Sequence, residues 1–191
     1  NRTVKLRLQN SSLFSITRKI HINSLDKSFS FSYISFCSFK RAFFENLAFS
    51  QRGYMLSENK LLFNKAVEKM PVIGILRDIS LGQEKECVKT SVAQGLTLIE
   101  VTMNTKNAIE ILKALKEASK GTELVVGAGT VRTLEELNLA LDAGAGFIVS
   151  PTTILEIIEK GNSLGIPMIP GALTPTEIEI AYRAGATCVK V

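Results

Sequence analysis

Residues 71–76, Pro71-Val72-Ile73-Gly74-Ile75-Leu76, form an apolar run with no polar alternation. Such a run is expected for a parallel β-strand that is buried on both faces. Similar runs recur at residues 98–102, 124–128, 147–150, 167–170 and 188–191. The repetition predicts a parallel sheet of six strands.

The segments between these runs have the pattern of amphipathic helices. Residues 107–119 place Ile111, Leu112 and Leu115 on one face. Three Thr-x-x-Glu sequences, each typical of an N-terminal capping box, are residues 133–136, 153–156 and 174–177. The glycines expected to end helices are Gly121, Gly144, Gly165 and Gly185.

The spacing of these glycines, 23, 21 and 20 residues, is typical of a repeated strand–helix unit. Such units build either a closed barrel or a doubly wound sheet. The barrel is favoured because every strand ends in a polar residue, a glycine or a proline, at the edge where barrel active sites lie. The expected fold class is therefore α/β, a TIM (β/α)8 barrel that is incomplete, because about six of the eight βα units are visible.

Residues 1–54 differ in composition from the rest of the chain. They hold ten serines, eight phenylalanines and nine Lys/Arg against two Asp/Glu, a net charge of +7. The whole chain carries +5, so the other 137 residues carry −2. Residues 28–36 alternate Ser with aromatic residues as a strand does, but no turn signal or partner strand is evident.

We predict two regions, a basic extension over residues 1–54 and a partial barrel over residues 55–191. The extension is expected to be disordered, and three origins stay open. The first origin is an organelle transit peptide, the second is upstream sequence translated by mistake before Met55, and the third is a structured extension. The segment Met55-Leu56-Ser57-Glu58-Asn59-Lys60 is suited to the start of a first helix, which favours mistranslation before Met55.

Composition argues against several classes of function. A mildly acidic body with a basic tail does not suit a nucleic-acid-binding core, and no apolar stretch is long enough to cross a bilayer. The three cysteines have no paired spacing, and the sole histidine, His21, lies in the extension. We therefore expect no disulfide framework, no metal site and no histidine-based catalysis.

The candidate catalytic residues lie at strand ends. Glu100 lies within Leu98-Ile99-Glu100-Val101, where a buried carboxylate is costly without a partner or a function. Lys190 lies at the end of the last run, where a desolvated amine can attack a carbonyl. From the pattern alone, Lys190 also fits a solvated terminal lysine. The Gly127-x-Gly129 sequence fits either a phosphate loop or tight packing.

Taken together, residues 69–191 resemble the KDPG/KHG aldolases, the class I 2-dehydro-3-deoxy-phosphogluconate and 4-hydroxy-2-oxoglutarate aldolases. The resemblance rests on several short sequences in the family's order and spacing. They are Pro71-Val72-Ile73, Ile99-Glu100-Val101-Thr102, Gly127-Ala128-Gly129-Thr130-Val131, Ile148-Val149-Ser150-Pro151, Ile169-Pro170-Gly171-Ala172-Leu173-Thr174-Pro175-Thr176-Glu177 and Ala184-Gly185-Ala186-Thr187-Cys188-Val189-Lys190-Val191.

The resemblance implies that Lys190 forms an imine with the substrate and that Glu100 is the general acid/base. Thr130 and Asn104 would hold the pyruvyl carboxylate and nearby groups. Asn104 stands where the family often has Arg, and an amide supplies no charge. Arg77 either supplies a cationic contact instead or makes a surface salt bridge. Pro151, at the end of the fourth strand, is a further candidate for the substrate site.

The implied reaction is cleavage of 2-dehydro-3-deoxy-6-phosphogluconate to pyruvate and glyceraldehyde 3-phosphate, with no metal or organic cofactor. Alternatives are 4-hydroxy-2-oxoglutarate, the phosphogalactonate epimer, or a catalytically inactive fragment. The implied small-molecule partner is this 2-keto-3-deoxy sugar acid phosphate or pyruvate. The implied assembly is a homo-oligomer, a trimer. The expected location is the cytoplasm, or an organelle if residues 1–54 are a transit peptide.

The family continues beyond the lysine with two further strands and a phosphate-binding loop. A sheet without them has two open edges. We therefore expect this chain to fold poorly or to aggregate, and to have weak aldolase activity or none.

Overall fold

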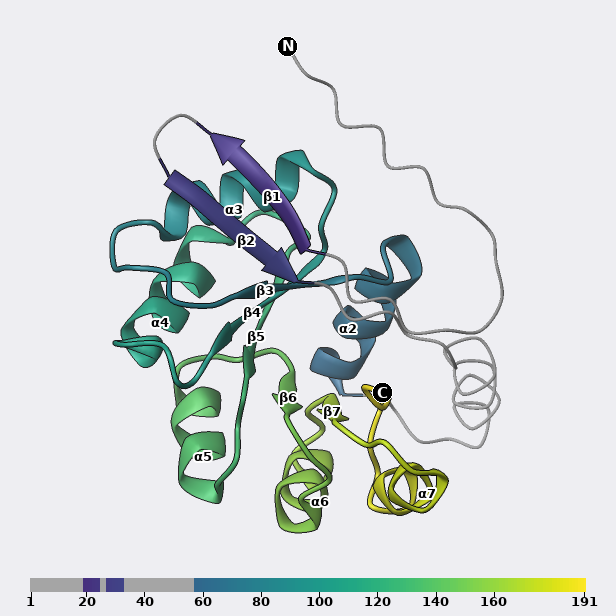
Figure 1. The fold of residues 1–191 in the computed structure, drawn as a ribbon. Coiled ribbons are helices and arrows are strands. Elements are labelled where there is room, and N and C mark those ends of the chain that lie inside the picture. The colour runs from purple at the N-terminus through teal and green to yellow at the C-terminus, as the bar shows by residue number, and fades with distance from the viewer. Residues whose placement is uncertain (1–18, 25–26, 33–56) are drawn as a thin grey trace.

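The computed structural model describes residues 19–24, 27–32 and 57–191. In the last of these segments, helices and strands alternate as the sequence predicts (Figure 1). The strands are β3 (Ile73–Leu76), β4 (Leu98–Thr102), β5 (Val125–Gly129), β6 (Ile148–Ser150) and β7 (Met168–Pro170). The helices are α2 (Glu58–Lys69), α3 (Glu84–Ala93), α4 (Ala108–Ala118), α5 (Leu134–Asp142), α6 (Leu155–Ser163) and α7 (Pro175–Arg183).

The five strands form one parallel sheet in chain order, β3-β4-β5-β6-β7. Sequential neighbours joined by helices are the arrangement of a (β/α)8 barrel, and the described residues make up part of one. At the centre of the sheet, Glu100 on β4 is paired with Ile75 on β3 and Gly127 on β5. Ile75, Glu100 and Gly127 therefore lie at the same height along the barrel, here called a level.

The prediction of a sixth strand over residues 188–191 is wrong. Only Lys190 pairs, as an isolated parallel bridge with Gly171, through bonds of 2.9 Å from Lys190 N to Pro170 O and from Ala172 N to Lys190 O. Upstream, the side chain of Thr187 accepts from Met168 N at 3.2 Å. That hydroxyl takes the place of a backbone carbonyl, so a regular ladder does not form there.

The sheet separates two apolar clusters, because successive side chains of a strand point to opposite faces. Figure 1 shows α3 to α7 around the convex side of the curved sheet and α2 on the concave side. The cluster under the outer helices includes Ile99, Val101, Val126, Ala128, Ile148 and Met168. The inner cluster contains Phe63, Ala66, Val67, Ile73, Leu98, Phe147, Val149, Ile169 and Cys188. Because Phe63, Ala66 and Val67 belong to α2, this helix closes the inner core.

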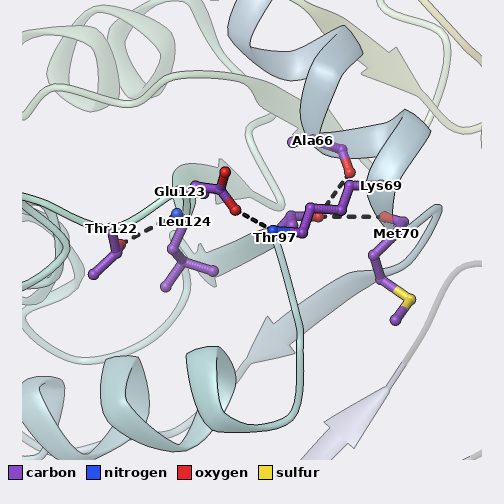
Figure 2. Close-up of polar contacts among 7 residues, drawn as sticks. All are labelled: Ala66, Lys69, Met70, Thr97, Thr122, Glu123 and Leu124. Atoms are coloured by element: carbon purple, nitrogen blue, oxygen red, sulfur yellow. Dashed lines mark hydrogen bonds and ion pairs between the residues drawn. The ribbon is translucent and has the colours of Figure 1, made fainter.

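Polar contacts anchor α2 at both of its ends. At the C-terminal end, the Thr97 hydroxyl lies 2.7 Å from Ala66 O and 3.4 Å from Met70 O, and Lys69 pairs with Glu123 (Figure 2). Lys60, near the N-terminal end, donates to Asn162 Oδ1 at 2.7 Å. The helix is therefore fixed between the start of β4 and the end of α6.

The predicted helix ends are partly confirmed. Thr174 and Glu177 form the expected capping box, and Ser57 caps α2 by accepting from Lys60 N. At α5, Thr133 accepts from Glu136 N, but Glu136 accepts from Arg132 N, so only half of a box forms. The four helix-ending glycines all have positive φ, from 72° to 95°.

The capping box predicted at residues 153–156 is wrong. The helix α6 begins one residue later, with Ile154 as its N-cap and no side-chain capping bond. The Thr153 hydroxyl instead donates to Gly171 O at 2.9 Å. The Thr153 hydroxyl therefore bonds to the loop after β7 instead of capping the first turn of α6.

Within the extension, β1 (Lys19–Ser24) and β2 (Lys27–Ser32) form an antiparallel pair. The expectation that the Ser/Phe alternation lacks a partner strand is therefore wrong for residues 27–32. The boundary between residues 54 and 55, and Cys37, lie outside the described residues.

The described part of the chain has two free cysteines, Cys87 and Cys188, both buried. No group of three His, Cys, Asp or Glu side chains within it is placed to hold a metal. None of its helices combines the length and the apolarity needed to span a bilayer.

The Thr97 hydroxyl gives a first prediction. Thr97→Val keeps the shape of this buried side chain and removes its hydrogen bonds to the end of α2. We expect the free energy of unfolding to fall by about 1 kcal/mol, measured by urea denaturation. Thr90→Val is the matched control, since the half-buried Thr90 makes no side-chain hydrogen bond with a described residue. An equal loss in both variants would contradict the assigned role of Thr97.

Candidate active site

Strand alternation places Glu100 on the inner face of the barrel. Leu98 belongs to the inner cluster, and Ile99 and Val101 belong to the outer one. The side chain of Glu100 is 3% exposed. A carboxylate therefore lies in the barrel interior, as the sequence predicts from the cost of burying it.

Gly129 on β5 provides the space that the Glu100 carboxylate occupies. A methyl group placed on Gly129 would lie only 2.6 Å from Cδ of Glu100. Of the two interpretations of Gly127-x-Gly129, this geometry favours tight packing. The glycine is required because a carboxylate from the neighbouring strand fills the position of its side chain.

Lys190 lies on the same inner face. Cys188 belongs to the inner cluster and Val189 packs against the outer one, so the alternation returns Lys190 to the inside. Its Cε atom lies 3.3 Å from the position of a methyl group on Gly171, and the residue is half-buried. Glu100 therefore fills the empty position of Gly129, whereas Lys190 lies beside Gly171, whose empty position is filled first by the carbonyl of Pro151.

The environment of Glu100 favours its protonated form. Burial raises the pKa of this carboxyl to about 7, against the opposing effects of the Lys190 and Arg77 charges. Its Oε2 atom has no hydrogen-bond partner among the described residues. A buried polar atom of this kind requires an explanation, and a ligand or water in the barrel mouth would supply the partner.

The remaining candidates follow strands at the same edge of the sheet. Arg77 comes directly after β3 and is exposed, and it forms no ion pair with a described residue. Asn104, in the loop after β4, is also exposed. Thr130 and Pro151 follow β5 and β6 and are half-buried.

The structure brings some of these residues closer together than others. Glu100, Lys190 and Arg77 are close enough to interact electrostatically. Asn104 and Thr130 form no side-chain hydrogen bond with any described residue. Asn104 and Thr130 therefore lie at the same end of the barrel as Glu100, Lys190 and Arg77, but no side-chain hydrogen bond joins them to these charged residues.

Sequence reasoning missed a hydroxyl pair below the loops. The Oγ1 atoms of Thr102 and Thr105 lie 3.0 Å apart, and Asp78 N donates to Thr105 Oγ1 at 3.3 Å. These bonds join the loop after β3 to the loop after β4. Asp78 has a left-handed φ of 56° and Thr130 one of 59°, which non-glycine residues rarely adopt. Two threonines three residues apart after a buried strand were the available signal.

The family model and the similar proteins point to the same family. Residues 63–191 match the family described as KDPG and KHG aldolase. The 2-dehydro-3-deoxy-phosphogluconate aldolase of Treponema pallidum is 32% identical over 126 residues, which cover 66% of this chain and 59% of that protein. The 2-dehydro-3-deoxy-6-phosphogalactonate aldolase of Escherichia coli K12 is 30% identical, over 64% of this chain and 60% of that one.

A solved structure shares the fold. The KDPG aldolase of Legionella pneumophila, with pyruvate captured as a covalent carbinolamine intermediate, superposes with a TM-score of 0.56. It is 28% identical, over 68% of this chain and 60% of the other. The chain thus spans about three fifths of the length of the relatives that it matches.

The raised pKa of Glu100 gives a second prediction. The folded chain holds a proton that the unfolded chain releases between about pH 4.5 and pH 7, so stability falls as the pH rises through this window. Glu100→Gln removes this dependence. We expect the variant to be more stable than the parent by about 1–3 kcal/mol near pH 8, and about equally stable near pH 4.

Urea denaturation at the two pH values measures the difference. The control is Glu159→Gln, which changes an exposed glutamate that has no ion pair with a described residue. If Glu100→Gln and Glu159→Gln show the same pH dependence, burial does not raise the pKa of Glu100.

Proposed function

The chain belongs to the KDPG and KHG aldolase family, and we propose that its site is built for class I aldol cleavage through a Schiff base. In this proposal Lys190 forms the imine and Glu100 is the general acid/base. The placement of a half-buried lysine and a buried carboxylate on one inner face is the observation that carries it. The imine itself accepts the electron pair that cleavage releases, so the reaction needs no metal ion.

The proposed reaction begins with the neutral amine of Lys190. It attacks C2 of a 2-oxo acid to form a carbinolamine, which loses water to give the imine. Removal of the proton from the C4 hydroxyl breaks the C3–C4 bond and releases an aldehyde. The electron pair moves into the imine to give an enamine. Protonation at C3 and hydrolysis of the imine then yield pyruvate and restore the amine.

Glu100 is suited to the proton transfers of this sequence. A carboxyl group with a pKa of about 7 is populated in both forms near neutral pH, as a group that both accepts and donates protons must be. Its unpartnered Oε2 gives the transferred proton a place to reside. Burial thus supports the role that the family resemblance assigns.

For the substrate we propose 2-dehydro-3-deoxy-6-phosphogluconate, cleaved to pyruvate and glyceraldehyde 3-phosphate. One observation leaves other substrates open. Asn104 is exposed and uncharged where the family often has Arg, so Arg77 is left as the cation for the substrate carboxylate. Phosphogalactonate and 4-hydroxy-2-oxoglutarate therefore stay open as substrates. A trimeric assembly and a cytoplasmic location stay predictions from the resemblance.

Imine trapping tests the proposed function. The open sheet edges lead us to expect weak turnover at most, but imine formation needs only the site around Lys190. We therefore expect pyruvate and borohydride to leave a reduced adduct on Lys190, located by peptide mass mapping. Lys190→Arg should abolish the adduct, because a guanidinium stays protonated. Lys160→Arg, which changes an exposed lysine of α6, is the control and should keep it. No adduct, or labelling spread over many lysines, would contradict the proposal and favour an inactive fragment.

Arg77 gives a further prediction for the same assay. Arg77→Gln removes the positive charge proposed to hold the pyruvate carboxylate. The pyruvate concentration for half-maximal trapping should rise about tenfold, the loss expected for one charge-assisted hydrogen bond. Asn104→Arg should lower that concentration, and Arg183→Gln, on the exposed face of α7, should leave it unchanged. An unchanged value for Arg77→Gln would exclude Arg77 as the carboxylate contact.

A further inference from the structure

The ring of Phe147 fills the barrel interior beside the second inner glycine of β5. A methyl group placed on Gly127 would lie 2.6 Å from Cζ and from both Cε atoms of that ring. Phe147 is fully buried and immediately precedes β6. Gly127, like Gly129, is therefore required by a side chain that occupies its empty position.

The two glycines place the Phe147 ring one level below the Glu100 carboxylate on the inner face of the sheet. Gly127 and Gly129 lie on the same face of β5, about 7 Å apart along the strand. The ring occupies the Gly127 level and the carboxylate occupies the Gly129 level. The backbone of Glu100 pairs with Gly127, so the side chain of Glu100 extends upward from the level of the ring.

Helix α2 supports this ring from the other side. The rings of Phe63 and Phe147 have centroids 5.5 Å apart and are tilted by 53°, a favourable aromatic arrangement. The bonds of Thr97 to the carbonyls of α2 hold the helix that carries Phe63 (Figure 2). A continuous column therefore runs from α2 through two aromatic rings to the level of Glu100.

We propose that Phe147 is a positioning residue for Glu100: its ring closes the space below the carboxylate, keeps water out of it, and holds the carboxylate over Gly129. The inference deepens the proposed function and rests on it for the role of Glu100. The ring contacts no reacting atom, and it acts through the placement and the dehydration of the carboxyl group.

The charged groups near Glu100 act in the opposite direction. Lys190 and Arg77 both lower the pKa of the carboxyl, and burial, which raises it, outweighs them. Cys188 lies on the same inner face, and burial raises the pKa of its thiol well above the ordinary range, so it stays uncharged. Water exclusion is therefore the property that a change at Phe147 would alter.

The test is the titration of the Glu100 carboxyl in the full chain labelled with ¹³C-glutamate. Its resonance is the one that Glu100→Gln removes. Phe147→Leu removes part of the ring and so loosens the packing that separates the carboxylate from water. We expect the pKa of Glu100 to fall from about 7 to about 6 in this variant. An unchanged pKa would overturn the proposal.

The matched control is Ile148→Val, which shortens the next residue along, on the outer face of the sheet. It should leave the pKa of Glu100 unchanged, and an equal fall in this variant would show a general effect of lost packing. If Phe147→Leu does not fold, Phe63→Leu serves in its place. It should lower the pKa by less, because it removes only the support of the ring, and no change would again overturn the proposal.

The titration does not depend on turnover, so the two proposals can fail separately. A missing adduct on Lys190 together with a lowered pKa in Phe147→Leu would reject the aldolase function and keep the role of Phe147. An adduct on Lys190 together with an unchanged pKa would do the reverse.

Discussion

The burial of the Glu100 carboxylate inside the barrel is the constraint on which the rest of the site depends. A charged group in this position is costly, and the structure gives Oε2 no hydrogen bond among the described residues. The site accommodates the group by the absence of a side chain at Gly129 and by the cations Lys190 and Arg77. The result is a carboxyl group that is neither fully ionised nor fully protonated near neutral pH.

This arrangement links the two ends of the barrel. At the mouth, Glu100 fills the empty position of Gly129 and Lys190 lies beside Gly171. At the base, α2 closes the interior with an aromatic contact and is held by polar bonds at both ends. Helix α2 lies far along the chain from Lys190, yet it packs against the ring that we propose keeps water away from Glu100.

Much of the fold could be predicted from the sequence, because buried parallel strands and helix-ending glycines are local patterns. Glu100 and Lys190 are predicted as site residues from the cost of burial and the family resemblance, and both lie on the inner face. The sixth strand and the cap at Thr153 were predicted wrongly, because hydroxyl groups there bond to distant backbone atoms. The position of Phe147 over Gly127 was also not predictable, since it depends on the register of adjacent strands.

Deuterium exchange at the methyl group of pyruvate, followed by NMR in D₂O, tests directly whether Glu100 and Lys190 act together. Exchange requires both the imine on Lys190 and a proton acceptor such as Glu100. We expect exchange by the parent chain, none by Lys190→Arg, and a rate lower by about 100-fold in Glu100→Gln. Exchange by the parent that Glu100→Gln leaves unchanged would contradict this expectation, because the buried carboxylate would then have no part in the chemistry.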